Sequence, residues 1–175
     1  SRTETSWADP AKQTLLGRQQ WEWLQRGLRA STAPFKVLAS GMIWDGKGNS
    51  TESDAWGSYA HEREELFRWL GKNKISGVVL IGGDIHVARL RRFPTRTTVG
   101  SDLTEFITSP MHDRLIPSAN GPDPNLIASA VEPWVFLKLT VDSTGAEPTL
   151  VGELMNRDGK RFFWWELRAG DLRRR

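Results

Sequence analysis

The run of apolar residues from Val78 to Ile81 ends at Gly82-Gly83 and is followed at once by Asp84 and His86. Aliphatic and β-branched residues bounded by glycine are typical of a central strand in a parallel sheet. Such sheets carry their chemistry just beyond the carboxyl ends of the strands. If the chain stays extended, Asp84 and His86 share one face, and the glycines let the backbone bend around an ion. The pattern favours a metal-binding pair, and a turn aspartate beside a surface histidine is the alternative.

The chain has 175 residues, which fits a single domain with its own core. No apolar stretch approaches the ~20 residues needed to cross a bilayer, so we expect no membrane span. The first thirty residues hold no secretion signal, which leaves the compartment unknown. The absence of cysteine excludes disulfides, thiolate metal ligands and a cysteine nucleophile within this chain.

The net charge of +3 comes from arginines that are concentrated in two places. These are the stretch with Arg89, Arg91, Arg92 and Arg96, and the end of the sequence at 173–175. On a strand, Arg89 and Arg91 share a face and could attract an anionic ester, and a solvated strand face is the simpler interpretation. Nucleic-acid binding is disfavoured because no recognised nucleic-acid module is present.

Hydrophobic spacing predicts an α/β first part over residues 1–87 and a mainly antiparallel β part over residues 88–175 of one domain. Two helices are expected, the first with Thr14 as its N-cap. An Arg157-Asp158-Gly159 hairpin joins the last two strands, and residues 110–132 are predicted to be a surface excursion. We expect helices at 14–30 and 60–73, strands at 35–40, 77–81, 88–93, 103–108, 133–142, 149–156 and 160–169, and a long loop at 41–57.

The nine tryptophans are a second constraint. Trp7, Trp44 and Trp56 lie in polar, glycine-rich segments that predict loops. Large aromatic side chains in loops need a cover. We therefore expect these loops either to fold over each other and wall a pocket or to be covered by another segment.

Several blocks together resemble the carboxyl-terminal half of the catalytic domain in PhoD-like (alkaline phosphatase D) metallophosphoesterases. The blocks are the segment from Thr14 to Ser40, Asp54-x-Trp56 with Tyr59, Glu62-Arg63 and Leu66, the run GVVLIGGDIHVA, and FITSP at 106–110. The resemblance implies a calcineurin-like sandwich of mixed sheets flanked by helices. It also implies hydrolysis of phosphate esters, mono- or diesters, at a centre of iron and calcium. Asp84 and His86 then correspond to the last metal-binding motif.

The chemistry of these two side chains agrees with such a centre. A hard carboxylate suits calcium, magnesium or manganese, and an imidazole suits iron, manganese or zinc. By resemblance, Asp54, Trp56, Tyr59 and Arg63 lie beside the substrate, and Ser109 could donate to phosphate. Their alternatives are loop packing for Trp56 and Tyr59, helix-surface ion pairs for Glu62 and for Arg63, and ordinary strand-end polarity for Ser109. His61 and His112 are expected at the surface, without a partner at ligand spacing.

One aspartate and one histidine cannot hold two metals by themselves. The family's earlier metal-binding motifs are not found in this sequence, so we expect an incomplete catalytic domain, completed by a missing N-terminal half or another chain. Three classes of function remain open: a metal-dependent phosphoric ester hydrolase, a non-catalytic binding module that has lost the metal centre, and a module that completes a sheet. The resemblance also implies export, since family members are commonly exported.

Overall fold

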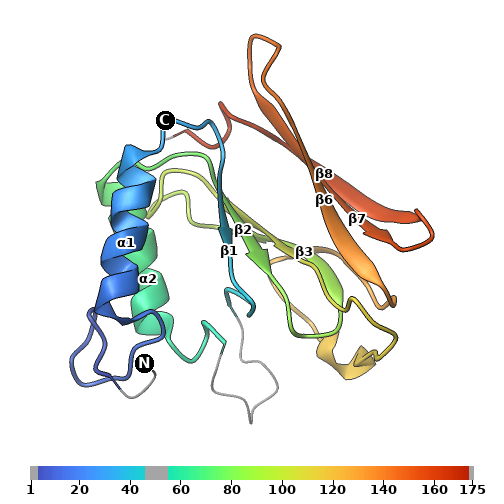
Figure 1. The fold of residues 1–175 in the computed structure, drawn as a ribbon, viewed down its shortest axis with the longest axis horizontal. Helices are drawn as coiled ribbons and strands as arrows, with labels where there is room; N and C mark the ends of the chain where they lie inside the picture. The colour runs from blue at the N-terminus through green and yellow to red at the C-terminus, as the bar shows by residue number, and fades with distance from the viewer. Residues whose placement is uncertain (1–3, 46–54, 174–175) are drawn as a thin grey trace.

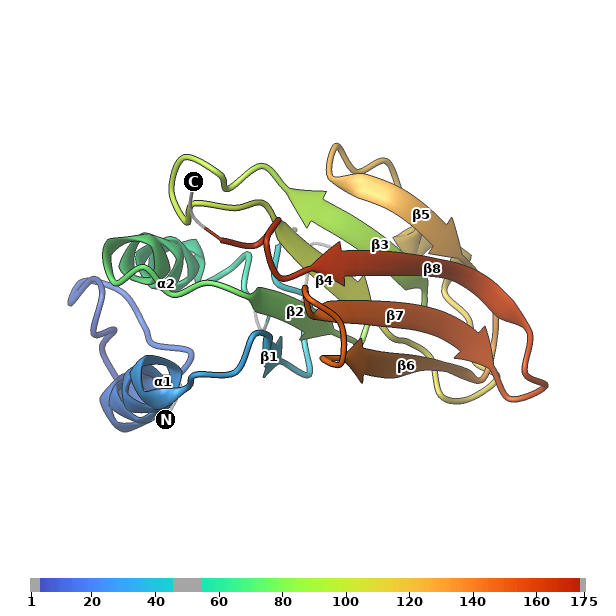
Figure 2. The same ribbon diagram turned by 90° about the horizontal axis from the view of Figure 1, so that it is seen from above.

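The computed structural model describes residues 4–45 and 55–173 and has three layers (Figures 1 and 2). A pair of helices covers one face of a five-stranded sheet, and a three-stranded sheet packs on the other face. The helices are α1 (Gly17–Ala30) and α2 (Ala60–Lys72), with the short 3₁₀ helix η1 (Pro117–Ala119). The strands are β1 (Lys36–Ala39), β2 (Val78–Gly82), β3 (Ala88–Phe93), β4 (Leu103–Ile107), β5 (Leu126–Ala130), β6 (Val135–Asp142), β7 (Thr149–Asn156) and β8 (Arg161–Arg168).

The larger sheet is mixed, with the strand order β1-β2-β4-β3-β5. β1 and β4 both run parallel to β2, as the apolar run of β2 predicts, whereas β3 and β5 are antiparallel to their neighbours. The smaller sheet is fully antiparallel, with the order β6-β7-β8. The predicted division at residue 87 into an α/β part and an antiparallel part does not coincide with the boundary between the two sheets, because β3, β4 and β5 belong to the larger sheet. The division itself stays a prediction.

Two hydrophobic cores hold the layers together. The first lies between the helices and the larger sheet and includes Leu66, Leu70 and Leu80. The second lies between the two sheets, where Phe106 of β4 meets Leu150 and Leu154 of β7. The apolar side chains of α2 therefore point into this core. None of the helices in the described part of the chain is long and apolar enough to span a bilayer.

Two of the predicted elements need correction. The first helix begins at Gly17, three residues after Thr14, although the Thr14 hydroxyl still accepts the Gly17 N–H at 2.8 Å. The segment 110–132 is not only a surface excursion, because it contains β5, which pairs with β3. Ile127 is the one large apolar residue after Leu126 in this edge strand, and Pro122 and Pro124 precede it. The sequence therefore gives it no periodic signal.

The packing of the two sheets requires a glycine at position 152. A Cβ atom on Gly152 of β7 would overlap the ring of Phe106. We expect Gly152→Ala to lower the free energy of unfolding by about 1–3 kcal/mol through overpacking, measured by urea denaturation. Gly145→Ala is the control, because its Cβ would meet only the Glu147 carbonyl oxygen at 3.9 Å. Equal stability of the two variants would contradict the tight contact between the sheets.

Candidate functional site

The parallel strands β1, β2 and β4 end at a common edge of the larger sheet. The Ser40 N–H donates to the Ile81 carbonyl at 2.9 Å, and the Thr108 N–H donates to the Gly82 carbonyl at 3.0 Å. Asp84 and His86 follow β2 at this edge, and Ser109 follows β4. Polar residues with the chemistry of ligands therefore gather where α/β proteins place their sites.

The backbone at Asp84 and His86 is not extended, so the argument from an i, i+2 shared face does not apply. Asp84 has φ 73° and His86 has φ 57°, and they are two of the four non-glycine residues with positive φ in the described chain. The Ile85 N–H donates to the Gly83 carbonyl at 3.0 Å across the first bend. Left-handed conformations at non-glycine residues are costly and cluster at functional sites.

The glycines before Asp84 allow another loop to pass close to the strand end. A Cβ on Gly82 would lie 2.6 Å from Glu105 Oε1 and 3.2 Å from Ile43 Cα, and one on Gly83 would lie 3.1 Å from the Gly41 carbonyl oxygen. These glycines therefore serve close packing against the 41–43 loop as well as the bend that follows them.

His86 is held by two hydrogen bonds. Its backbone N–H donates to Ser109 Oγ at 3.0 Å, and its ring Nδ1 lies 2.8 Å from the Arg114 carbonyl oxygen. A carbonyl oxygen only accepts, so Nδ1 carries the proton and Nε2 of the neutral ring keeps its lone pair. Metal-binding histidines are commonly oriented by such a bond from the other ring nitrogen. Ser109 thus holds His86 in place through an acceptor bond.

His112 is exposed, as predicted, but its ring contacts another histidine, which the sequence spacing did not indicate. Its ring centroid lies 4.7 Å from that of His86, with an interplanar angle of 68°. The two residues are 26 positions apart, and the fold brings them together because the 109–114 loop returns past the end of β2. His61 is half-buried, and its Nε2 lies 3.1 Å from the Gln13 carbonyl oxygen.

Both expectations for the loop tryptophans are met in part, because Trp44 and Trp56 cover each other beside this edge, whereas Trp7 is covered by another segment, stacking on Trp21 of α1 with the ring centroids 3.8 Å apart. Trp44 and Trp56 stack with their centroids 4.6 Å apart. Trp44 Nε1 donates to the Ile81 carbonyl at 3.0 Å, and Trp56 Nε1 donates to Ser40 Oγ at 3.1 Å. Tyr59 is buried beyond them at the start of α2. Asp54 lies outside the described residues.

Glu62 does not form the predicted helix-surface ion pair with any described residue, and the ion pair of Arg63 is half-buried. Glu62 is fully buried and accepts hydrogen bonds from Ser6 and Thr14 and from the N–H groups that precede α1. Arg63 forms an ion pair with Asp45 and donates to the Trp44 carbonyl at 3.2 Å. Both residues therefore hold loops against α2, which the helical pattern alone does not indicate.

A buried charge cluster, which we call the Arg91 network, lies behind the loop of Trp44. Its centre is Arg91, whose Nη1 lies 3.0 Å from Glu105 Oε2. Arg91 Nε lies 2.6 Å from Asp123 Oδ2 as an ion pair, although the N–H direction does not make it a hydrogen bond. Arg91 Nη1 also donates to the Asp45 carbonyl at 3.1 Å. The network consists of Asp45, Arg63, Arg89, Arg91, Glu105 and Asp123.

The Arg91 network overturns the expectation of a solvated or ester-attracting face on β3. Arg89 and Arg91 do share a face, but both are buried and both pair with Asp123. Burial raises the pKa of Glu105 to about 7, while Arg91 and the Trp44 N–H favour the ionised form and act in the opposite direction. The sequence signal was a glutamate inside the apolar strand LTEFI, directly opposite Arg91 in the β3–β4 register.

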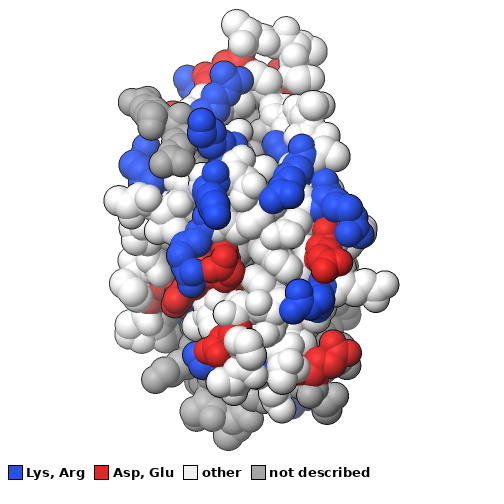
Figure 3. Space-filling model, turned by 90° about the vertical axis from the view of Figure 1, so that its left-hand side faces the viewer, with Lys and Arg blue, Asp and Glu red and all other residues white. Residues whose placement is uncertain are grey.

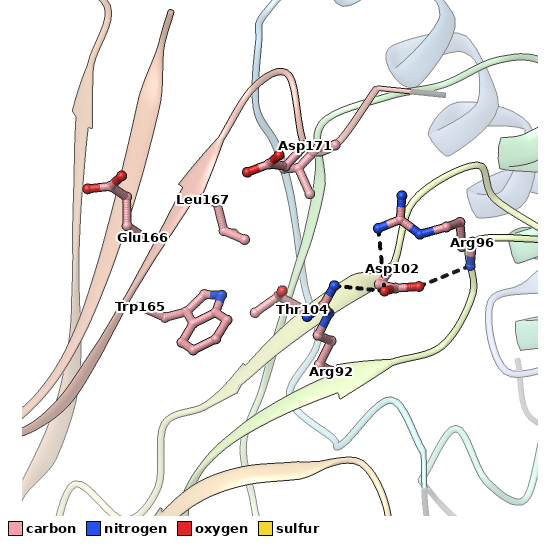
Figure 4. Close-up of a pocket in the computed structure, with 9 residues that line it drawn as sticks. Arg92, Arg96, Asp102, Thr104, Trp165, Glu166, Leu167 and Asp171 are labelled. Atoms are coloured by element: carbon pink, nitrogen blue, oxygen red, sulfur yellow. Dashed lines mark hydrogen bonds and ion pairs between the residues drawn. The ribbon is translucent and has the colours of Figure 1, made fainter. Parts of the chain in front are cut away.

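A cavity of about 260 Å³ lies between the two sheets at the opposite end of β4 (Figure 4). Thr104 and the indole of Trp165 face it, together with Arg92 and Arg96. Both arginines pair with Asp102, at 2.9 Å and 3.6 Å. Its cationic groups are thus already partnered, and it lies away from Asp84.

The helical face of the molecule carries mixed charge (Figure 3). Lys and Arg side chains run along this face with Asp and Glu between them. On α1 the exposed residues Arg18, Glu22 and Arg26 alternate in sign at a spacing of four. Such alternation is typical of a solvated helix face.

The donor chemistry fits one edge of a metal centre. An exposed carboxylate on Asp84 and an unprotonated Nε2 on His86 are suitable ligands for a metal such as those expected above. Within residues 4–45 and 55–173, however, no group of three or more His, Asp or Glu side chains is placed to hold an ion. Asp84 and His86 by themselves could therefore supply only part of a ligand set.

These features define an α/β protein with two packed sheets and polar residues at the ends of its parallel strands. A family model described as PhoD-like phosphatase matches residues 1–138, and the chain belongs to this family. It is 34% identical over 82 residues to alkaline phosphatase D of Bacillus subtilis (strain 168), an alignment that covers 43% of this chain and 14% of that protein.

A solved structure described as "Structure of PhoD" matches the fold with a TM-score of 0.53 and 18% identity. The match covers 86% of this chain and 36% of the solved one. The similarity therefore concerns the mixed α/β architecture with two sheets and few helices. This chain corresponds to well under half the length of either relative.

Proposed function

We propose that this chain is part of the catalytic domain of a metal-dependent phosphoric ester hydrolase, in which Asp84 and His86 are metal ligands. The observation that carries the proposal is the bent segment after β2, where His86 Nδ1 donates to the Arg114 carbonyl and Nε2 has no hydrogen-bond partner among residues 4–45 and 55–173. It occurs in a chain of the PhoD-like phosphatase family, at the sheet edge where α/β proteins bind ligands.

In this proposal Asp84 contributes a carboxylate oxygen and His86 contributes Nε2. Iron and calcium are the metals that the family resemblance favours, and manganese, magnesium or zinc would also suit these donors. When bound, paired cations neutralise ester oxygens and acidify a water molecule for attack on phosphorus. Ser109 and the Arg114 carbonyl orient His86 for this task.

The remaining ligands come, in our proposal, from polypeptide outside this sequence. Two donors cannot hold two cations, and the chain covers 36% of the solved relative. The two sheets would then form one side of a calcineurin-like sandwich, with the missing N-terminal half or another chain as partner. The phosphate ester, mono- or diester, would bind between the parts.

The ester contacts proposed from the resemblance are Asp54, Trp56, Tyr59, Arg63 and Ser109. Four of these residues are described. Arg63 forms an ion pair with Asp45, and Ser109 accepts a hydrogen bond from the backbone N–H of His86. Trp56 and Tyr59 are buried, so any contribution to the ester site would act through the stacked loop. We therefore propose that these residues shape the pocket wall.

The test is the loss of metal in Asp84→Asn and His86→Ala, made in the assembly that is active. Each variant is expected to bind metal at least about tenfold more weakly than the wild type, because removal of even a supporting group lowers metal affinity by about 10–100-fold. Metal content is measured by elemental analysis and the fold by circular dichroism. His61→Ala is the matched control, because His61 lies on α2 and contacts the Gln13 carbonyl. Unchanged metal and activity in both ligand variants would refute the proposal.

The second candidate is a non-catalytic binding or sheet-completing module that has lost the metal centre. It is favoured by β1, which has no strand partner on its outer edge among the described residues and exposes 41% of Val37. An open strand edge is a template for pairing. Metal content, and activity together with the missing half, separate both modules from the hydrolase.

A further inference from the structure

The loop that carries His112 is fixed by its backbone to the start of β6. The Val135 N–H donates to the Pro110 carbonyl at 2.7 Å, and the Trp134 N–H donates to the His112 carbonyl at 3.1 Å. Neither bond uses the His112 side chain. The ring can therefore be replaced while the path of the loop is retained.

The His112 side chain instead completes a chain of hydrogen bonds that ends on His86. His112 Nδ1 accepts the Arg114 N–H at 3.0 Å, and the Arg114 carbonyl accepts the proton of His86 Nδ1 at 2.8 Å. The first bond fixes the turn that presents the carbonyl to His86. The ring contact of 4.7 Å between the two histidines limits the rotation of the His86 ring.

We propose that His112 is a positioning residue for His86. It holds the Arg114 carbonyl where that oxygen selects the Nδ1–H tautomer, which leaves Nε2 of His86 available to a metal ion. The part of this inference that concerns metal rests on the proposed function, whereas the selection of the tautomer does not. His112 itself is assigned no contact with metal or substrate.

Three substitutions separate the hydrogen bond from the ring contact. His112→Asn keeps an acceptor at the same place, because an asparagine oxygen bonds the N–H two residues on. His112→Phe keeps an aromatic ring without an acceptor, and His112→Ala removes both. The tautomer of His86 is measured from its ring ¹⁵N chemical shifts in the metal-free protein at pH 8.5, where ordinary imidazoles are neutral.

The wild type is expected to show His86 in the Nδ1–H form. The ratio of this form to the Nε2–H form should fall about fivefold in His112→Ala, the effect of one typical hydrogen bond, and should fall similarly in His112→Phe. His112→Asn should restore it. An unchanged ratio in His112→Ala, or a ratio restored by Phe and not by Asn, would overturn the positioning role.

Manganese(II) added to the same variants in the active assembly tests the proposed function separately. Paramagnetic broadening confined to Asp84, His86 and their neighbours supports metal binding, and its weakening in His112→Ala relative to His112→Asn supports the consequence of positioning. Absence of broadening in the wild type would overturn the metal proposal while leaving the tautomer result standing. Equal broadening in all variants would overturn the link between His112 and metal binding.

Discussion

Replacing Glu62 with alanine is expected to lower the free energy of unfolding by about 3–5 kcal/mol, a large share of the stability of a domain of this size. Glu62 is fully buried, and within the described residues no cation pairs with it. Its Oε1 accepts the hydroxyls of Ser6 and Thr14 at 2.6 Å and 2.5 Å, and its Oε2 accepts the N–H groups of Leu15 and Leu16 at 3.0 Å and 3.2 Å. Alanine would leave all four donors buried or half-buried without an acceptor.

The effect has a structural reason in the start of α1. The N-cap residue, Leu16, has no side chain that accepts a hydrogen bond, the Thr14 hydroxyl accepts the Gly17 N–H, and the first turn has no acidic residue. The carboxylate of Glu62, reaching across from α2, supplies both the acceptor and the negative charge that a helix N-terminus favours. Loss of Glu62 would therefore release the N-terminal loop and loosen α1.

Glu62→Gln is the matched control for this prediction. Its carbonyl oxygen can still accept from the two N–H groups, and its NH₂ can donate to the hydroxyls of Ser6 and Thr14. We expect a loss of about 1–2 kcal/mol for this variant, measured with Glu62→Ala by urea denaturation at pH 7. A loss below about 0.5 kcal/mol for alanine, the range of ordinary surface changes, would show that the carboxylate is not the anchor described.

The order and type of most elements were predictable because apolar periodicity reports burial directly. The run from Val78 to Ile81 gave a parallel strand, and the Arg157-Asp158-Gly159 turn gave the β7–β8 hairpin, which is confirmed with Gly159 at φ 79°. β5 was not predicted, because an edge strand made largely of small residues shows no hydrophobic periodicity. Its position is set by pairing with β3, a tertiary contact.

The location of the candidate site could be predicted from local sequence patterns, whereas its geometry could not. Placing Asp84 and His86 after a strand needs only local sequence. Their positive φ angles depend on the packing of Gly82 and Gly83 against the 41–43 loop, and the partners of His86 come from 23 and 28 residues away. Long-range contacts of this kind leave no periodic trace.

The same limit explains the charged residues. A glutamate on a helix and arginines on a strand are usually solvated, so Glu62, Arg89 and Arg91 were expected at the surface. Each is buried because carboxylates or donors from distant segments meet it. Their burial thus marks the places where the loops are tied to the sheet and helices.

The largest remaining effect is expected for Arg91→Met. At pH 8 this variant should lose about 2.5–3.5 kcal/mol of unfolding free energy. Wild-type Glu105 is then ionised beside Arg91, whereas the variant must either keep a buried anion without its cation or bind a proton, which adds about 1.4 kcal/mol for the pH unit between 7 and 8. At pH 5 the loss should be about 1–2 kcal/mol, since a protonated Glu105 needs no cation and mainly hydrogen bonds are lost. Urea denaturation of both proteins at the two pH values measures the difference.

The sign follows from the pKa of Glu105. Burial raises this pKa to about 7, above the ordinary value of 4.5, so the protonated form favours the folded state. The corresponding stability is fully present below pH 4.5 and is lost as the pH rises through about 7. Without Arg91 the pKa of Glu105 rises further, and the loss of stability continues above pH 7. The gap between variant and wild type therefore widens with pH.

Arg91→Met combined with Glu105→Gln is the control that isolates this mechanism. Glutamine cannot ionise. Relative to a Glu105→Gln single variant, the double variant should therefore lose the same unfolding free energy at pH 5 and at pH 8. In all of these variants the ion pairs of Asp123 with Arg89 and of Asp45 with Arg63 are retained. An equal loss in Arg91→Met at the two pH values would contradict the titration of Glu105. A gap that widens with pH would show that Arg91 stabilises the ionised form of Glu105. Glu105 accepts the Trp44 N–H at 2.8 Å, so this buried ion pair would also help to hold the loop of Trp44 beside the candidate site.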